Sequence, residues 1–243
     1  MTTSDPGTAP APTVPFRGTI DVAARGWDHD AWGGDFFPPD LPREWRLTFY
    51  ANQFRSVLVP GRILLRAEAS DLAQWRTDTH EEFRFFLEMS GRLVERFRSG
   101  GVAALLRWLE PLLDRTAGLL LLGFSRRREP TLTHWIEVLG ECFALHTLTG
   151  GEGVMSPGAS AVPALGNRYR CWYPGLGATG LGHAGRLGLV LHPPVDLPGL
   201  RRQIEAFMAY ARPAERATLC FAGAPPSVQA MQQARILVEL LGG

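Results

Sequence analysis

Cysteine is scarce in this sequence, and no cysteine motif is present. Cys142, Cys171 and Cys220 are its three cysteines, and they are far apart. A zinc ribbon or a thioredoxin-like dithiol needs a Cys-x-x-Cys pair, so the sequence excludes both. Each cysteine stands among strand-like neighbours, and free cysteine is among the most buried residue types. We therefore expect three small buried side chains with free thiols, as in proteins of a reducing compartment.

Long apolar segments are also missing. The purely apolar runs, such as residues 119–122, are far short of the ~20 residues that cross a bilayer. Residues 1–15 are rich in Thr, Ala and Pro, and they lack the basic start and apolar core of a signal peptide. We expect a disordered tail over residues 1–15, no membrane partner and a cytoplasmic location.

Neither sign of charge is in excess, and common catalytic motifs are missing. The 243 residues include 25 basic and 24 acidic side chains, which leaves a net charge of +1. This balance offers no general attraction to nucleic acid, so we expect no nucleic-acid partner. There is no Gly-x-Ser-x-Gly elbow, no His-Glu-x-x-His and no EF-hand loop. The glycine-rich residues 175–182 lack the Lys-Ser/Thr of a phosphate-binding loop, and we interpret them as a linker.

What the sequence contains is an alternation of short apolar segments with longer helical patterns. A segment with five glycines and two prolines has no helical period, so we expect a loop in place of a helix over residues 150–167. Apolar residues at helical spacing predict helices over residues 42–54, 69–75, 102–115, 132–140, 198–211 and 227–241. Short apolar runs predict strands over residues 19–24, 56–60, 83–88, 118–124, 142–146, 169–173, 187–192 and 217–221.

This alternation predicts an α/β fold. Strands that alternate with helices form a parallel sheet with helices outside it, and eight such strands favour closure into a TIM-like barrel of about 250 residues. We expect residues 16–243 to form one such domain. The alternative is an open, doubly wound sheet, which a smaller number of strands would favour.

An ordered pattern of aromatic, glycine and proline residues follows the first strand candidate. It consists of Trp27, Trp32, Gly34, Phe36, Pro38, Leu41 and Pro42. This pattern resembles the opening signature of the YecE-like family (domain of unknown function 72). The helical residues 46–54 and the Phe-Arg-Phe of residues 83–85 are similar to the segments that come next in the family. The resemblance implies a barrel related to the TIM fold, and it implies no established reaction.

At the expected strand ends, the chain departs from the polar residues of this family. Leu58 stands where the family carries a glutamate, and Glu88 stands where it commonly carries a lysine. The family's Arg-Leu-His in the seventh strand becomes residues 190–192, Val-Leu-His, and its paired asparagines become residues 222–223, Ala-Gly. The site that the resemblance implies has therefore been either rebuilt or lost.

Ligands of α/β barrels bind where loops converge at the C-terminal ends of the strands. Three arginines in residues 126–128 could hold a phosphate or a carboxylate there, or form a solvated turn. Histidines and carboxylates at this rim could bind a divalent cation, or lie at the edge of the core, and we assign no metal. Aromatic side chains could line a pocket or plug the barrel. The candidate ligand-binding residues are Arg25, Trp27, Asp28, His29, Arg62, Glu88, Arg126, His146, Trp172 and His192.

We predict a barrel protein that binds a small polar or anionic ligand at this C-terminal rim. The alternative is a noncatalytic scaffold or regulatory protein that has lost the polar site. An open cavity lined by charged residues would favour the first hypothesis, and a rim filled by Leu58, Leu122 and Val190 would favour the second. Neither a cofactor nor a reaction nor an oligomeric state follows from the sequence.

Overall fold

The fold is a parallel sheet that curves into a nearly closed barrel. The computed structural model describes residues 18–122, 130–147, 171–174, 186–211 and 214–242. Within this part of the chain the strand pairs are parallel, in the order β5-β4-β3-β2-β1-β7-β6. The strands are β1 (Thr19–Arg25), β2 (Ser56–Val59), β3 (Arg84–Ser90), β4 (Thr116–Leu122), β5 (Leu145–Thr147), β6 (Leu187–Val190) and β7 (Arg216–Phe221).

Two residues link the edge strands β5 and β6 of the sheet. The main-chain N–H of Cys171 donates a hydrogen bond to the carbonyl of Thr147 in β5, with an N–O distance of 2.9 Å. The N–H of Trp172 donates to the carbonyl of Leu187 in β6 at 3.0 Å. These two residues belong to the strand predicted over residues 169–173, of which residues 169–170 lie outside the described residues, and Trp172 forms an isolated bridge with Gly188. The predicted eight strands are therefore, among the described residues, seven strands and one bridge.

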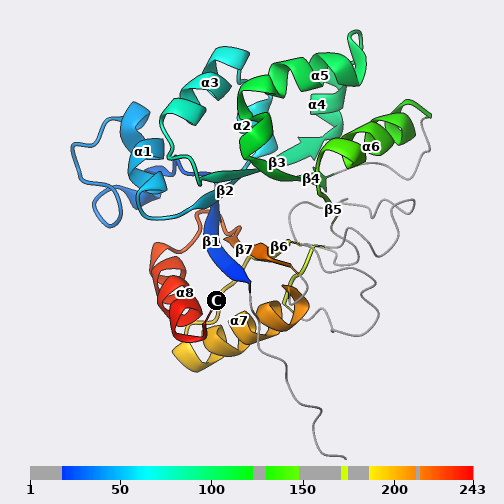
Figure 1. Ribbon diagram of the computed structural model, residues 1–243. Helices are drawn as coiled ribbons and strands as arrows, with labels where there is room; N and C mark the ends of the chain where they lie inside the picture. Colours follow the sequence, from blue (N-terminus) through cyan, green and yellow to red (C-terminus); the bar gives the residue numbers. More distant parts are fainter. Residues whose placement is uncertain (1–17, 123–129, 148–170, 175–185, 212–213, 243) are drawn as a thin grey trace, which may run out of the picture.

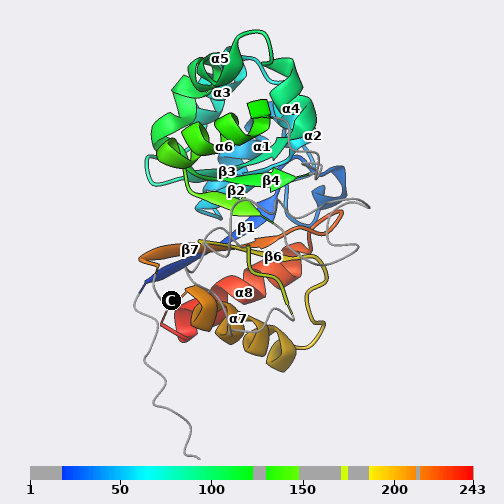
Figure 2. The same ribbon diagram turned by 90° about the vertical axis from the view of Figure 1, so that its right-hand side faces the viewer.

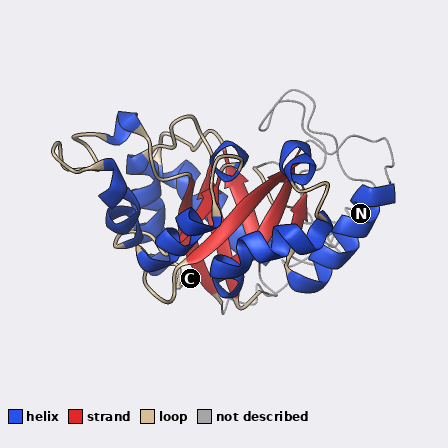
Figure 3. Cartoon of the chain, turned by 90° about the horizontal axis from the view of Figure 1, so that it is seen from above, coloured by secondary structure: helices blue, strands red, loops and turns tan. Residues whose placement is uncertain are grey.

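Helices cover the outside of this sheet. Helices α1 to α6 lie on one side of it, and α7 and α8 lie on the other, next to β1, β6 and β7 (Figure 1). Figure 2 shows the same two groups from a second direction, and Figure 3 shows the strands enclosed between helices. The helices are η1 (Asp30–Trp32), η2 (Arg43–Trp45), α1 (Arg46–Ala51), α2 (Gly61–Leu64), α3 (Ala69–Thr77), α4 (Gly91–Arg96), α5 (Gly101–Leu109), η3 (Glu110–Arg115), α6 (Pro130–Cys142), α7 (Leu197–Ala211) and α8 (Val228–Leu240), where η marks a 3₁₀ helix.

The predicted helices are present, but two of them are divided. Over residues 42–54, the 3₁₀ helix η2 leads into α1. Over residues 102–115, α5 gives way to η3 because Pro111 has no main-chain N–H to continue the α-helical hydrogen bonds. The sequence did not predict α2 and α4, since one or two turns are too short for the 3.6-residue period to show.

One of the three cysteines differs from the prediction. All three are free, and Cys171 and Cys220 are buried, but Cys142 is exposed. The prediction of a buried Cys142 is wrong because this residue ends α6, and the strand that it was expected to open begins only at Leu145. The tail predicted over residues 1–15, the loop predicted over residues 150–167 and the linker predicted over residues 175–182 lie outside the described residues. Among those that are described, no helix is long and apolar enough to cross a membrane.

Strand side chains alternate between the inside of the barrel and the layer beneath the helices. The larger apolar cluster lies in that outer layer, where strands and helices pack together. A smaller one fills the inside and includes Ala23, Leu58, Phe86, Leu120 and Cys220. The middle of the barrel is therefore apolar, and the charged side chains that point inward lie toward its two ends.

Candidate functional site

A buried ion pair lies at the C-terminal end of the barrel. Arg25 ends β1 and Glu88 lies near the end of β3, and each follows an inward-facing residue by two positions. The Glu88 carboxylate accepts hydrogen bonds from Nε and Nη2 of Arg25, the second at 2.9 Å, and from the main-chain N–H of Gly61 at 2.8 Å. Glu88 is 2% exposed, whereas 24% of the Arg25 side chain is exposed. The guanidinium therefore connects a buried carboxylate to the solvent.

Burying a carboxylate costs several kcal/mol unless other groups compensate for the lost water. Here the two N–H groups of Arg25 and the amide of Gly61 replace it. Burial by itself would lower the pKa of Arg25, but the hydrogen bond and the charge of Glu88 raise it above its usual value. Arg25 stays charged, and its guanidinium is held in one orientation at the rim.

His29 lies beside this pair, held by the turn that leaves β1. Gly26 makes the turn with φ of +81°, and a Cβ atom there would lie 3.3 Å from Pro60 and 3.4 Å from the His29 ring. Nε2 of His29 is 3.0 Å from the carbonyl oxygen of Arg25, which can only accept, so Nε2 carries the proton and Nδ1 is an acceptor. Burial lowers the pKa of His29, and the nearby charge of Arg62 lowers it further. His29 is therefore a neutral side chain.

Two further candidates lie exposed at the same end of the barrel. Arg62 follows β2 in α2, and His192 follows β6. Arg62 makes no hydrogen bond or ion pair with the residues that the structure describes, and its charge reaches His29. Arg25, His29, Glu88 and Arg62 thus form one group, which we call the rim group.

The other candidates do not join the rim group. Asp28 forms ion pairs with Arg43 and Arg46, which balance its charge, although this charge also acts on His29. Trp27 and Trp172 are 7% and 2% exposed, so neither offers an open face for stacking. Their burial agrees with the alternative interpretation, in which the aromatic side chains close the barrel.

His146 lies inside the barrel, and Arg126 lies outside the described residues. The His146 ring packs edge-on against Phe86, with ring centroids 5.8 Å apart, and it lies over Gly118. Neither of its ring nitrogens has a hydrogen-bond partner among the described residues. Within the same part of the chain, no three His, Cys, Asp or Glu side chains lie together as a metal site would require.

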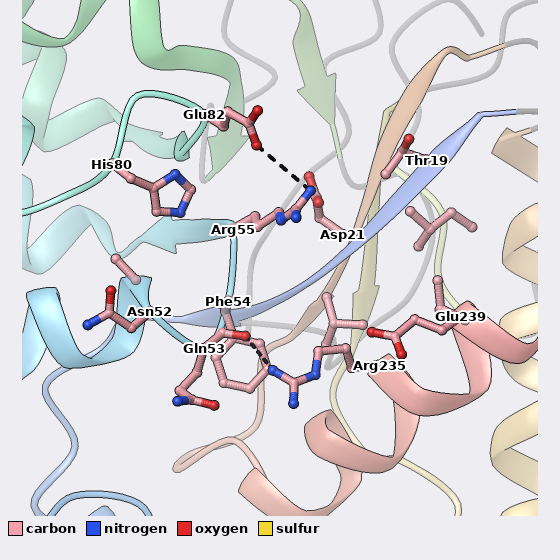
Figure 4. A pocket seen from close by; sticks show the side chains of 14 residues that line it. Thr19, Asp21, Asn52, Gln53, Phe54, Arg55, His80, Glu82, Arg235 and Glu239 are labelled. Carbon is pink, nitrogen blue, oxygen red and sulfur yellow. Dashed lines mark hydrogen bonds and ion pairs between the residues drawn. The ribbon is translucent and has the colours of Figure 1, made fainter. Parts of the chain in front are cut away.

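A cavity of about 610 Å³ opens at the opposite, N-terminal face of the barrel (Figure 4). Arg55 and Glu82 face each other in it at 3.8 Å, and Arg235 of α8 donates to the main-chain carbonyl of Gln53 at 2.7 Å. Asp21 is buried at its edge. The sequence interpretation missed this cavity because it considered only the ends of strands, whereas residues 52–55 and 80–82 precede strands. Ligands of TIM-like barrels usually bind at the C-terminal face, so the rim group remains the first candidate site.

The comparisons with known proteins agree with this architecture. The model of the family described as "Protein of unknown function DUF72" matches residues 22–149. A DUF72 protein from Thermotoga maritima is 15% identical with a TM-score of 0.57, over 90% of this chain and 99% of its own. A DUF72 protein from Enterococcus faecalis is 11% identical with a TM-score of 0.60, over 91% of this chain and 96% of its own. The comparison with curated proteins found no similar sequence.

An enzyme has a similar fold. The crystal structure of a D-psicose 3-epimerase in the presence of D-fructose has a TM-score of 0.50. It is 8% identical, over 92% of this chain and 100% of the enzyme. At such low identity, the likeness shows a shared barrel fold and nothing about the reaction.

Proposed function

The chain belongs to the DUF72 family of proteins of unknown function, and we propose that it binds a small anionic molecule at the C-terminal rim of its barrel. The buried Arg25–Glu88 pair is the observation that carries this proposal. Strand ends at this face hold the ligand sites of α/β barrels. A buried carboxylate that fixes an arginine at this position favours a binding site over a purely structural role.

The charges of the rim group favour an anion. Arg25 and Arg62 each contribute a positive charge, Glu88 contributes a negative one and His29 is neutral, which leaves an excess of one positive charge. A carboxylate or phosphate would meet Arg62 and the exposed part of the Arg25 guanidinium. The acceptor nitrogen of His29 is available to a hydroxyl group beside the anion.

The class of ligand that combines an anionic group with hydroxyls includes sugar acids and sugar phosphates. The structural likeness to an epimerase crystallised with D-fructose makes these molecules the first to test, as a proposal from fold alone. We propose no reaction, because Arg25 and the main-chain amide of Gly61 already engage Glu88, the carboxylate of the rim group.

The experiment is a binding screen of sugar acids and sugar phosphates by thermal shift, followed by titration calorimetry of the hits. We expect Arg62→Gln to weaken binding by about tenfold to hundredfold, because a charge-assisted hydrogen bond contributes about 1.5–3 kcal/mol. Arg202→Gln is the matched control, since Arg202 is an exposed arginine of α7. Binding that Arg62→Gln and Arg202→Gln leave equally strong would show that the rim group is not the site.

A noncatalytic scaffold is the second candidate function. The observation that favours it is the apolar filling directly below the rim group, where Leu58, Phe86 and Leu120 are almost fully buried. A screen in which no anion stabilises the protein, while the fold remains intact, would support this alternative and exclude the first.

A further inference from the structure

The N-terminal mouth of the barrel holds a second concentration of arginines. Arg84 begins β3, Arg216 begins β7 and Arg186 directly precedes β6. All three line a cavity of about 320 Å³, whose inner wall includes Phe86 from the barrel interior. This cavity lies at the opposite end of the strands from the rim group, so a ligand there would be a separate one.

Within the described part of the chain, one of these three guanidiniums has a carboxylate partner. Nε of Arg216 donates to Asp21 at 2.6 Å. Arg84 donates from Nη1 to the main-chain carbonyls of Glu81 and Phe83, at 2.9 and 3.0 Å, and forms no ion pair within the described chain. Arg186 forms neither a hydrogen bond nor an ion pair with any described residue.

The carboxylate that lines the cavity does not balance these charges. Asp114 forms a two-pronged ion pair with Arg76, in which Nη2 lies 2.9 Å from Oδ2. The pairing with Arg76 lowers the pKa of Asp114, so the acid remains charged and engaged. Asp114 is paired to Arg76, and Arg216 is paired to Asp21 of β1. Arg84 and Arg186 therefore carry two positive charges that no described carboxylate compensates.

We propose that the N-terminal mouth binds a small molecule through a phosphate group, held between Arg84 and Arg186 with Arg216 beside them. Two uncompensated guanidiniums match the two negative charges of a phosphate. Each guanidinium can donate two parallel hydrogen bonds to two oxygens of one phosphate. A volume of about 320 Å³ is at the lower end of known ligand sites, roughly 300–1,000 Å³, which suits a small phosphorylated molecule.

The apolar part of such a molecule would lie against Phe86. Behind this ring, His146 is 2% exposed and both its nitrogens lack hydrogen-bond partners among the described residues. A buried polar group without a partner is rare, because it loses water without compensation. A ligand that reaches past Phe86 would supply the missing hydrogen bond.

Cys142 provides a direct readout of this site. It lines the same cavity and is exposed, whereas Cys171 and Cys220 are 1% and 0% exposed. A neutral reagent such as iodoacetamide should therefore alkylate Cys142 first, with the thiolate displacing iodide. A phosphate bound between the arginines blocks access to this thiol, while an anion at the rim does not.

The experiment measures the alkylation rate of the full chain by intact mass, with inorganic phosphate exchanged for chloride at constant ionic strength. We expect the rate to fall with phosphate until it saturates. Arg186→Gln should raise the half-protecting concentration about tenfold, as the loss of one charge-assisted hydrogen bond does. Arg84→Lys, which keeps the charge but not the planar fork, should raise it less.

The controls separate this site from the rim. Arg62→Gln alters the rim group and should leave the protection unchanged, as should Arg202→Gln on α7. Alkylation that phosphate does not slow, or protection that survives in Arg186→Gln and is lost in Arg62→Gln, would overturn the proposal. Neither result decides the rim proposal, which the separate binding screen of sugar acids and sugar phosphates tests.

Discussion

His146 should make the stability of the barrel depend on pH. Desolvation lowers the pKa of this buried side chain from 6.5 to about 4, and the charge of Arg186 adds to the shift. The unfolded chain therefore takes up a proton as the pH falls through 6.5, whereas the folded chain does so only near pH 4. Above pH 6.5, His146 does not change the free energy of unfolding. As the pH falls from 6.5 toward 4, His146 lowers this free energy.

The size of this effect follows from the two pKa values of His146. Proton uptake by the unfolded chain lowers the free energy of unfolding by about 2 kcal/mol at pH 5 and about 3 kcal/mol at pH 4. His146→Leu removes the titrating group and replaces it with an apolar side chain of similar size. We expect the stability lost between pH 7 and pH 5 to be about 2 kcal/mol smaller in this variant.

Urea unfolding followed by tryptophan fluorescence measures this difference at both pH values. His80→Gln is the control, because His80 is exposed and should leave the pH dependence unchanged. The absolute stability of His146→Leu is not the readout, since a change in packing shifts both pH values together. If His146→Leu keeps the full pH dependence of the natural chain, the imidazole is solvated or partnered in the folded state, and the reasoning fails.

Three further predictions about the local geometry can be tested by urea unfolding. Gly26→Ala should destabilise the fold by about 1–2 kcal/mol, because φ is positive there and the added Cβ would crowd Pro60. Gly34→Ala, where φ is also positive but the space is open, should cost less, and equal costs would contradict the steric argument. Tyr50→Phe should cost about 1–3 kcal/mol, since its hydroxyl links the main chains of β1 and β2, and a loss near zero would refute that role. Glu88→Gln should cost about 2 kcal/mol by leaving Arg25 without its charge partner, and an unchanged midpoint would argue against the buried pair.

The architecture could be predicted because the longer strands and helices show their periods in the local sequence. The strand over residues 169–173 is an instructive case, since the sequence indicates its place correctly. Among its described residues, Cys171 bonds to β5 and Trp172 to β6, and this pairing with two distant strands is not visible in the local pattern. Short elements such as α2 and α4 carry too few residues to reveal a period.

The site was less predictable, because its contacts join distant segments. The sequence places Glu88 at a strand end, but the amide of Gly61 that binds it lies after the neighbouring strand, β2. His146 is expected at the rim, whereas its register with Leu120 puts the ring inside the barrel. No local pattern records such a register, and a slip of one residue reverses which face a side chain takes.

Among the described residues, the charges inside this barrel lie at its two ends for a physical reason. Arg25 with Glu88 lies at one end and Asp21 with Arg216 at the other, and each arginine reaches solvent. An ion in the apolar layer around Phe86 would lose its water without such access, at a cost of several kcal/mol. The same layer separates the rim group from the N-terminal mouth. Substitutions of Arg62 and Arg186 should therefore act on separate ligands, and their effects on stability should add, as expected for sites without shared partners.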